Sequence, residues 1–103
     1  MSNPIKVATT SSVPPGRGIL VDADGLLLAL FNIDGVFYAI DDACPHQGAP
    51  LSEGAVRGCV VICPWHAAEF EIPTGKLLCA PGTRDVQTYP VTIDGDDVMV
   101  DID

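Results

Sequence analysis

The chain has 103 residues, a length that fits one compact domain and is too short for a two-domain enzyme. Fourteen acidic and five basic residues give a formal net charge of −9, which argues against a nucleic-acid partner because phosphate binding requires Lys and Arg. An acidic surface favours partners with basic docking faces, and such association weakens as the salt concentration rises. Simple solubility is the alternative explanation of the charge.

No segment of the sequence predicts export or membrane insertion. The N-terminal residues lack a basic start followed by a long apolar run, and the longest apolar stretch, residues 26–31, is far too short to cross a bilayer. We therefore expect a soluble, cytoplasmic protein with no membrane contact. Because disulfides are rare in a reducing compartment, the four cysteines favour metal binding over two disulfides.

Short apolar runs rich in Val, Ile and Leu follow one another, and none keeps a convincing helical period over ten residues. This pattern predicts a mostly β protein. In chain order, the expected strands are residues 5–8, 18–21, 26–33, 36–40, 56–62, 69–72, 86–89, 91–93 and 98–102.

Asp-Gly pairs at residues 24–25, 34–35 and 94–95 each lie between apolar runs. Such pairs favour tight hairpin turns because Asp and Gly tolerate positive φ. They predict successive antiparallel hairpins. The regular pattern is interrupted at residues 41–55, a long polar segment with Pro and Gly, and a loop of that length in a small domain is usually functional.

This segment contains Cys-Pro-His at residues 44–46, and Cys-Pro-Trp-His follows at residues 63–66. Each motif supplies one thiolate and one imidazole, whereas a structural zinc site more typically uses close Cys-Cys and His-His pairs. If the two loops face each other, both cysteines reach one iron and both histidines the other, which is the ligation of a Rieske centre. The four candidate metal and cofactor ligands are Cys44, His46, Cys63 and His66.

The two motifs resemble the two-part Rieske motif, Cys-x-His followed by Cys-x-x-His, and the chain is similar to soluble Rieske-type ferredoxins. The similarity extends to residues 48–54, to Phe70, to residues 74–75, and to Pro81 and Gly82 at the position of the family's third loop. The resemblance implies one Rieske-type [2Fe–2S] cluster on the four candidate ligands. It also implies an all-β fold, in which a single domain, residues 1–103, has an antiparallel β-sandwich base and an inserted cluster-binding subdomain at about residues 41–83.

The resemblance further implies a one-electron carrier rather than an enzyme. The sequence has no dinucleotide fingerprint, so the chain needs an electron donor. By resemblance, the donor is a flavin-dependent ferredoxin reductase and the acceptor is the terminal oxygenase of an aromatic-ring-hydroxylating dioxygenase system, with a monomer between transient complexes. Two alternatives remain open: a small Rieske subunit of a nitrite reductase or other larger redox enzyme, and a structural zinc module that uses the same ligands.

The sequence departs from family patterns near the ligands. Respiratory-chain Rieske proteins have an additional Cys in each loop, where this chain has Ala49 and Trp65, so no disulfide clamp is expected. They also carry Ser and Tyr hydroxyls where this chain has Ala68 and Phe70. Fewer donors to sulfur disfavour reduction, which predicts a potential in the lower part of the Rieske range of roughly −150 to +300 mV. Ala67 follows the second His where Gly is common, and it would be strained if that position required positive φ.

Two other cysteines, Cys59 and Cys79, lie in apolar sequence surroundings. Free cysteines in such surroundings behave as small hydrophobes, so we expect both to pack in the core. Trp65 lies between two candidate ligands, and the sequence allows either a partner-docking role or a space-filling role under the loop.

Overall fold

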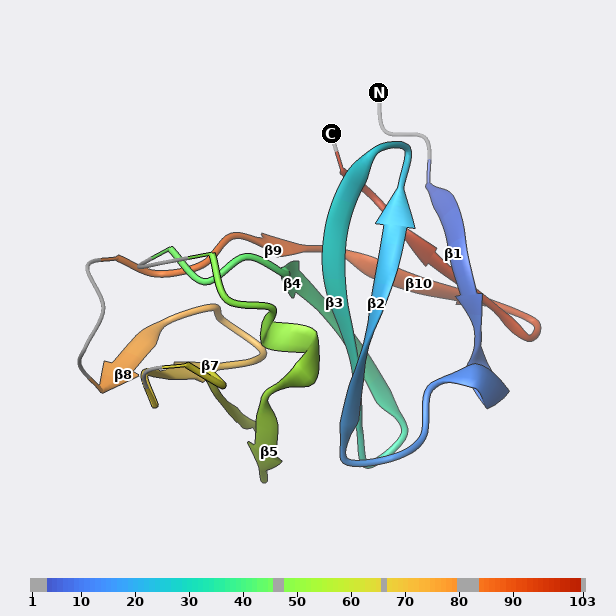
Figure 1. The fold of residues 1–103 in the computed structure, drawn as a ribbon. Coiled ribbons are helices and arrows are strands. Elements are labelled where there is room, and N and C mark those ends of the chain that lie inside the picture. Colours follow the sequence, from blue (N-terminus) through green and yellow to red (C-terminus); the bar gives the residue numbers. More distant parts are fainter. Residues whose placement is uncertain (1–3, 46–47, 66, 80–83, 103) are drawn as a thin grey trace.

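The structure is a computed structural model that describes residues 4–45, 48–65, 67–79 and 84–102 (Figure 1). Within these ranges every strand pairing is antiparallel, which confirms the predicted all-β fold class. Two short 3₁₀ turns, η1 (Thr10–Ser12) and η2 (Leu51–Glu53), accompany the strands, and no described helix is long and apolar enough to span a membrane. The strands are β1 (Ile5–Thr9), β2 (Arg17–Ala23), β3 (Leu26–Ile33), β4 (Val36–Asp41), β5 (Ala55–Arg57), β6 (Val60–Ile62), β7 (Glu69–Glu71), β8 (Leu77–Cys79), β9 (Thr88–Tyr89), β10 (Val91–Asp94) and β11 (Asp97–Val100).

The described strands form three sheets. One has the order β1-β11-β10, the second β2-β3-β4-β9 and the third β5-β6-β7-β8. The first two sheets pack on each other around a shared apolar core and form a β-sandwich, which we call the base. The third sheet, which we call the small sheet, lies on the other side of β3 and β4 (Figure 1).

Strand β3 joins the two cores because its side chains alternate between them. Leu28 and Leu30 belong to the core of the base, whereas Ala29 and Phe31 belong to the core shared with the small sheet. All four side chains have 0% exposure. A strand buried on both faces has a near-continuous apolar sequence, and residues 26–31 have that property.

Two of the three predicted hairpin turns are confirmed. Residues 24–25 and 34–35 form two-residue turns between paired strands, with positive φ at both positions. The third turn lies one residue later than predicted, because Asp94 pairs with Asp97 and leaves residues 95–96 between the strands. Gly95 then has φ 63°, in agreement with the preference for Gly at the first central position of a type II′ turn.

The strand predicted at residues 56–62 was wrong. The chain instead turns at Gly58 and Cys59, where Gly58 has φ 59°, and β5 pairs with β6 across that turn. The predicted core packing of Cys59 was wrong for the same reason, since the hairpin tip leaves its side chain exposed. Strand β8 was not predicted. Cys79 is its last residue, and the core packing expected for Cys79 stays a prediction.

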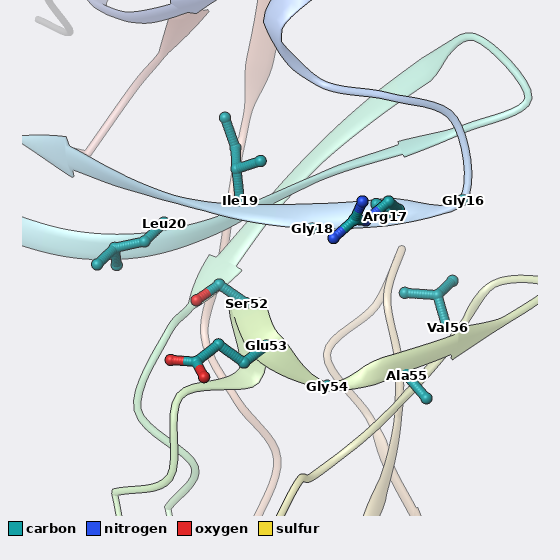
Figure 2. Close-up of a pocket in the computed structure, with 10 residues that line it drawn as sticks. All are labelled: Gly16, Arg17, Gly18, Ile19, Leu20, Ser52, Glu53, Gly54, Ala55 and Val56. Atoms are coloured by element: carbon teal, nitrogen blue, oxygen red, sulfur yellow. The ribbon is translucent and has the colours of Figure 1, made fainter.

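A cleft of about 540 Å³ follows the line where β2 approaches η2 and β5 (Figure 2). Arg17 and Leu20 lie on the β2 side of this cleft, and Glu53 lies on the opposite side. Gly54 allows the chain to leave η2 close to the small sheet, because a Cβ at this position would clash with the carbonyl oxygen of Ile62. Any larger residue at position 54 would therefore push η2 and β6 apart.

Asp41 links the end of β4 to β9 and to the segment before it. Its carboxylate accepts hydrogen bonds from the Tyr89 hydroxyl at 2.6 Å and from the Gln87 backbone N–H at 3.3 Å. Burial, helped by the hydrogen bond and the charge of Asp41, raises the pKa of Tyr89 from 10.0 to about 12. This link matters for the site because β4 leads directly into the segment that contains Cys44.

We predict that Tyr89→Phe lowers the free energy of unfolding by about 1 kcal/mol at neutral pH, because the hydrogen bond to the carboxylate is lost. The pKa of Tyr89 is higher in the folded state, so this contribution is fully present below pH 10.0 and is lost as the pH rises toward about 12. Urea unfolding followed by circular dichroism between pH 7 and 11.5 measures the difference. Tyr38→Phe is the control, since the described residues give the Tyr38 hydroxyl no hydrogen bond. Equal stability of Tyr89→Phe and wild type at neutral pH would contradict the prediction.

Candidate metal centre

Asp42 anchors the first of the two segments that contain predicted ligands. We call this segment, residues 43–50, the first Cys loop. The backbone carbonyl of Asp42 accepts a hydrogen bond from the Leu51 N–H at 2.7 Å, and its carboxylate accepts one from the Ser52 N–H at 2.9 Å. The first and last residues of the loop pair in an isolated β-bridge. The two ends of the loop are therefore held together at the edge of the base.

Two backbone hydrogen bonds shape the inside of the first Cys loop. The Cys44 N–H donates to the Ala49 carbonyl at 2.9 Å, and the Gly48 N–H donates to the Cys44 carbonyl at 2.7 Å. The second of these bonds joins Gly48 to the Cys four residues before it. Both bonds involve the backbone of Cys44, so the loop fixes the position of the Cys44 Cα.

The second Cys loop, residues 63–68, repeats this arrangement between β6 and β7. The Cys63 N–H donates to the Ala68 carbonyl at 2.7 Å, and the Ala67 N–H donates to the Cys63 carbonyl at 3.1 Å. The spacing of donors and acceptors from the Cys is the same in both loops. Two segments of different sequence thus adopt one backbone pattern, each beginning at a predicted thiolate ligand.

The repeated pattern requires the same unusual conformation four residues after each Cys. Gly48 has φ 73° and Ala67 has φ 60°. Positive φ is readily available to Gly but costs an L-residue with a Cβ roughly 1–2 kcal/mol. The predicted condition for strain at Ala67 is therefore met, and the second Cys loop is the more strained of the two.

Cys44 and Cys63 are both buried at 2% exposure and belong to the core shared with the small sheet. Neither forms a disulfide. Fully buried Ala49, Ala68 and Phe70 lie in the same core and exclude water from the side of the thiols that faces it. Both Cys loops lie at one end of the molecule (Figure 1).

The other two predicted ligands, His46 and His66, lie outside the described residues, as do Pro81 and Gly82 of the expected third loop. Among the described residues no group of three or more His, Cys, Asp or Glu could hold a metal ion, since each motif is described without its His. The two described thiols fit an iron–sulfur cluster, because thiolate is the ligand type that such clusters select. Their burial in one apolar core fits a site shielded from water.

Trp65 does not fill space beneath the second Cys loop. Its exposed fraction is 58%, whereas Ala68 and Phe70 in and after the same loop have 0% exposure. The space-filling interpretation was wrong, and the docking interpretation stays a prediction. Asp42 was missed, because a second Asp after Asp41 at the start of a polar loop gives no sequence signal of burial.

Neither Cys loop contains a charged residue. The acidic hairpin of β10 and β11, with Asp94, Asp96 and Asp97, lies at the opposite end of the molecule from the loops (Figure 1). The net charge of −9 therefore comes from residues outside the two Cys loops.

Comparisons with known proteins agree with this geometry. The family model described as Rieske [2Fe-2S] domain matches residues 3–90. The 3-phenylpropionate/cinnamic acid dioxygenase ferredoxin subunit of Escherichia coli strain K12 is 43% identical over 101 residues, which cover 97% of this chain and 94% of that protein. The solved Sphingomonas yanoikuyae B1 ferredoxin matches with a TM-score of 0.92 at 32% identity, over 98% of this chain and 100% of that one. A chain in the complex of reduced oxygenase and oxidized ferredoxin in carbazole 1,9a-dioxygenase matches with a TM-score of 0.89 at 33% identity, over 95% and 92% of the two chains.

We predict that Ala67→Gly raises the free energy of unfolding by about 1 kcal/mol, because Gly removes the cost of positive φ in the second Cys loop. Gly48→Ala is the matched change in the first Cys loop and should lower stability by a similar amount. A Cβ at Gly48 would meet no atom of the described residues within 4 Å, so this control reports backbone conformation without a steric clash against them. Chemical unfolding of both variants beside wild type measures the effects, and a destabilised Ala67→Gly would contradict the account of the loop.

Proposed function

This chain belongs to the Rieske [2Fe–2S] domain family, and on that premise we propose that it carries single electrons on a cluster held by Cys44, His46, Cys63 and His66. Membership of the family implies a Rieske-type [2Fe–2S] cluster. The observation that supports this ligand set most strongly is the repeated backbone pattern of the two Cys loops. Each loop places one buried thiol in the same apolar core. We place the cluster-binding subdomain at about residues 41–83 of a single domain.

The residues of this chain would set the properties of the site in three ways. Cys44 and Cys63 would supply two thiolates, and His46 and His66 two neutral imidazoles, which leaves an oxidised cluster without net charge. The bound cluster accepts and releases one electron in the range of Rieske potentials. The apolar core around the two cysteines keeps water away from the thiolates, and Asp42 and the loop hydrogen bonds hold the backbone of the first ligand in place.

We infer that the electron acceptor is the terminal oxygenase of an aromatic-ring-hydroxylating dioxygenase system and that the donor is a flavin-dependent ferredoxin reductase. The curated relative at 43% identity is a dioxygenase ferredoxin subunit, and a similar ferredoxin has been solved in complex with an oxygenase. A nitrite reductase subunit is a less well supported alternative, because both of these relatives belong to dioxygenase systems. The protein would act in the cytoplasm, as a monomer between transient complexes.

Reconstitution tests this function directly. The purified protein is combined with NADH, a flavin-dependent ferredoxin reductase and the oxygenase served by the Escherichia coli relative, and hydroxylated product is measured. Product should form only when all the components are present, and Cys63→Ser, which removes one thiolate ligand, should abolish it. Full oxygenase turnover without the protein, or none with it, would contradict the proposal.

We predict a reduction potential in the lower part of the Rieske range of roughly −150 to +300 mV. Ala68 and Phe70 are fully buried in the core that contains both cysteines, and neither has a hydroxyl to donate to sulfur. Ala68→Ser should raise the potential, because a donor to sulfur stabilises the reduced state. Ala55→Ser, at an exposed position on β5, is the control and should leave it unchanged. Protein-film voltammetry measures all three, and a wild-type midpoint well above zero would contradict the prediction.

A further inference from the structure

A hollow of about 730 Å³ opens beside the first Cys loop. Four segments form its wall: the beginning of β3, the end of β4, the first Cys loop, and residues 84–87, which precede β9. Cys44 and Pro45 are part of this wall. A group that enters the hollow therefore contacts the loop that carries a proposed cluster ligand. The cleft in Figure 2 differs in this respect, because no residue of either Cys loop lines it.

The two carboxylates in the wall of the hollow are engaged within the protein. Asp41 accepts hydrogen bonds from the Tyr89 hydroxyl and the Gln87 N–H. Asp85 accepts a hydrogen bond from the Leu77 N–H at 2.8 Å and ties β8 to the segment before β9. Both carboxylates therefore have a structural role.

Arg84 is the basic residue in this wall, and it is exposed. Within the described part of the chain, its guanidinium makes no hydrogen bond or ion pair. A guanidinium can bind a carboxylate through two parallel hydrogen bonds, which fixes orientation as well as position. Arg84 is thus available to a carboxylate from outside the protein.

The same wall also presents an apolar side chain. Leu27 is 51% exposed although it belongs to β3, whose following residues are fully buried. Pro45 of the first Cys loop lies in the same wall and is half-buried. Covering Leu27 would remove apolar surface from water, which favours association. The hollow therefore combines one cation that the described residues leave unpaired and one apolar contact next to the first Cys loop.

We propose that this hollow receives the acceptor oxygenase, which places a carboxylate against Arg84 and an apolar side chain over Leu27. This inference rests on the proposed function. The net charge of −9 attracts basic surfaces from a distance but does not select one orientation. Arg84 is positive, so it would attract a carboxylate of the partner and repel a basic group. Docking poses that place a basic group at Arg84 would therefore be disfavoured. The hollow would thereby fix the pose in which the first Cys loop faces the acceptor.

The test compares Arg84→Gln with Arg17→Gln. Both replace an exposed arginine and change the net charge equally, but Arg17 lines the separate cleft in Figure 2. Stopped-flow mixing of the dithionite-reduced protein with the oxidised oxygenase gives the second-order rate constant. We expect Arg84→Gln to lower it about fivefold, the effect of losing one exposed ion pair. Arg17→Gln should leave it unchanged or slightly higher, because a more acidic carrier is attracted more strongly to a basic partner.

A change in driving force would act in the opposite direction. Removing a positive charge near the first Cys loop would lower the reduction potential of the carrier, which favours electron donation. A slower Arg84→Gln reaction therefore reports docking, and voltammetry of the same variant confirms the direction of any shift in potential.

A second pair of variants tests the apolar contact without changing charge. Leu27→Ala should lower the rate constant, whereas Leu20→Ala should not. Leu20 is matched to Leu27, with 54% exposure on the neighbouring strand β2, but it lines the cleft in Figure 2.

Equal rates for the hollow variants and their controls would overturn the inference while leaving the proposed function intact. If Arg84→Gln slowed reduction of this protein by the reductase but not its electron transfer to the oxygenase, the assignment to the oxygenase would be overturned. A wild-type protein that does not reduce the oxygenase would instead overturn the proposed function, and this inference with it.

Discussion

The burial of β3 on both faces is the constraint on which the rest of the structure depends. Leu28 and Leu30 close the β-sandwich, while Ala29 and Phe31 support the core that contains both candidate thiolates. Alternate side chains of one strand thus stabilise two different packing layers. A polar substitution at Leu28 or Leu30 would weaken the base, and one at Ala29 or Phe31 would weaken the core that contains both candidate thiolates.

The candidate metal centre is built from the backbone of two loops rather than from a single rigid element. Hydrogen bonds from each Cys and from the residue four positions after it follow the same pattern in both loops, and the base and the small sheet hold the loop ends. The exposed surface near the loops includes Trp65 and Leu27, whereas the acidic hairpin of β10 and β11 lies at the far end. The acidic hairpin is therefore remote from the exposed apolar side chains near the loops.

Much of this arrangement could be predicted from the sequence because strong local signals coincide. The bounds of β3 follow from a continuous apolar run between two Asp-Gly turns, and the four candidate ligands, which stay a prediction, were identified from their spacing. Residues 56–62 were wrongly predicted as one strand because Val56 precedes and Val60 follows the turn at Gly58 and Cys59, so a hairpin tip resembles the middle of a strand. The burial of Asp42 and the exposure of Trp65 depend on contacts between distant segments, which no local pattern records.

The central claim is that Cys and His ligands from both loops hold one two-iron cluster, and pulsed electron paramagnetic resonance of the dithionite-reduced protein tests it most directly. The account predicts a paramagnetic signal with hyperfine coupling to imidazole nitrogen, in a protein that contains iron and acid-labile sulfide in equal amounts. A signal without nitrogen coupling would contradict the His ligation. A silent protein that contains zinc would contradict the cluster itself.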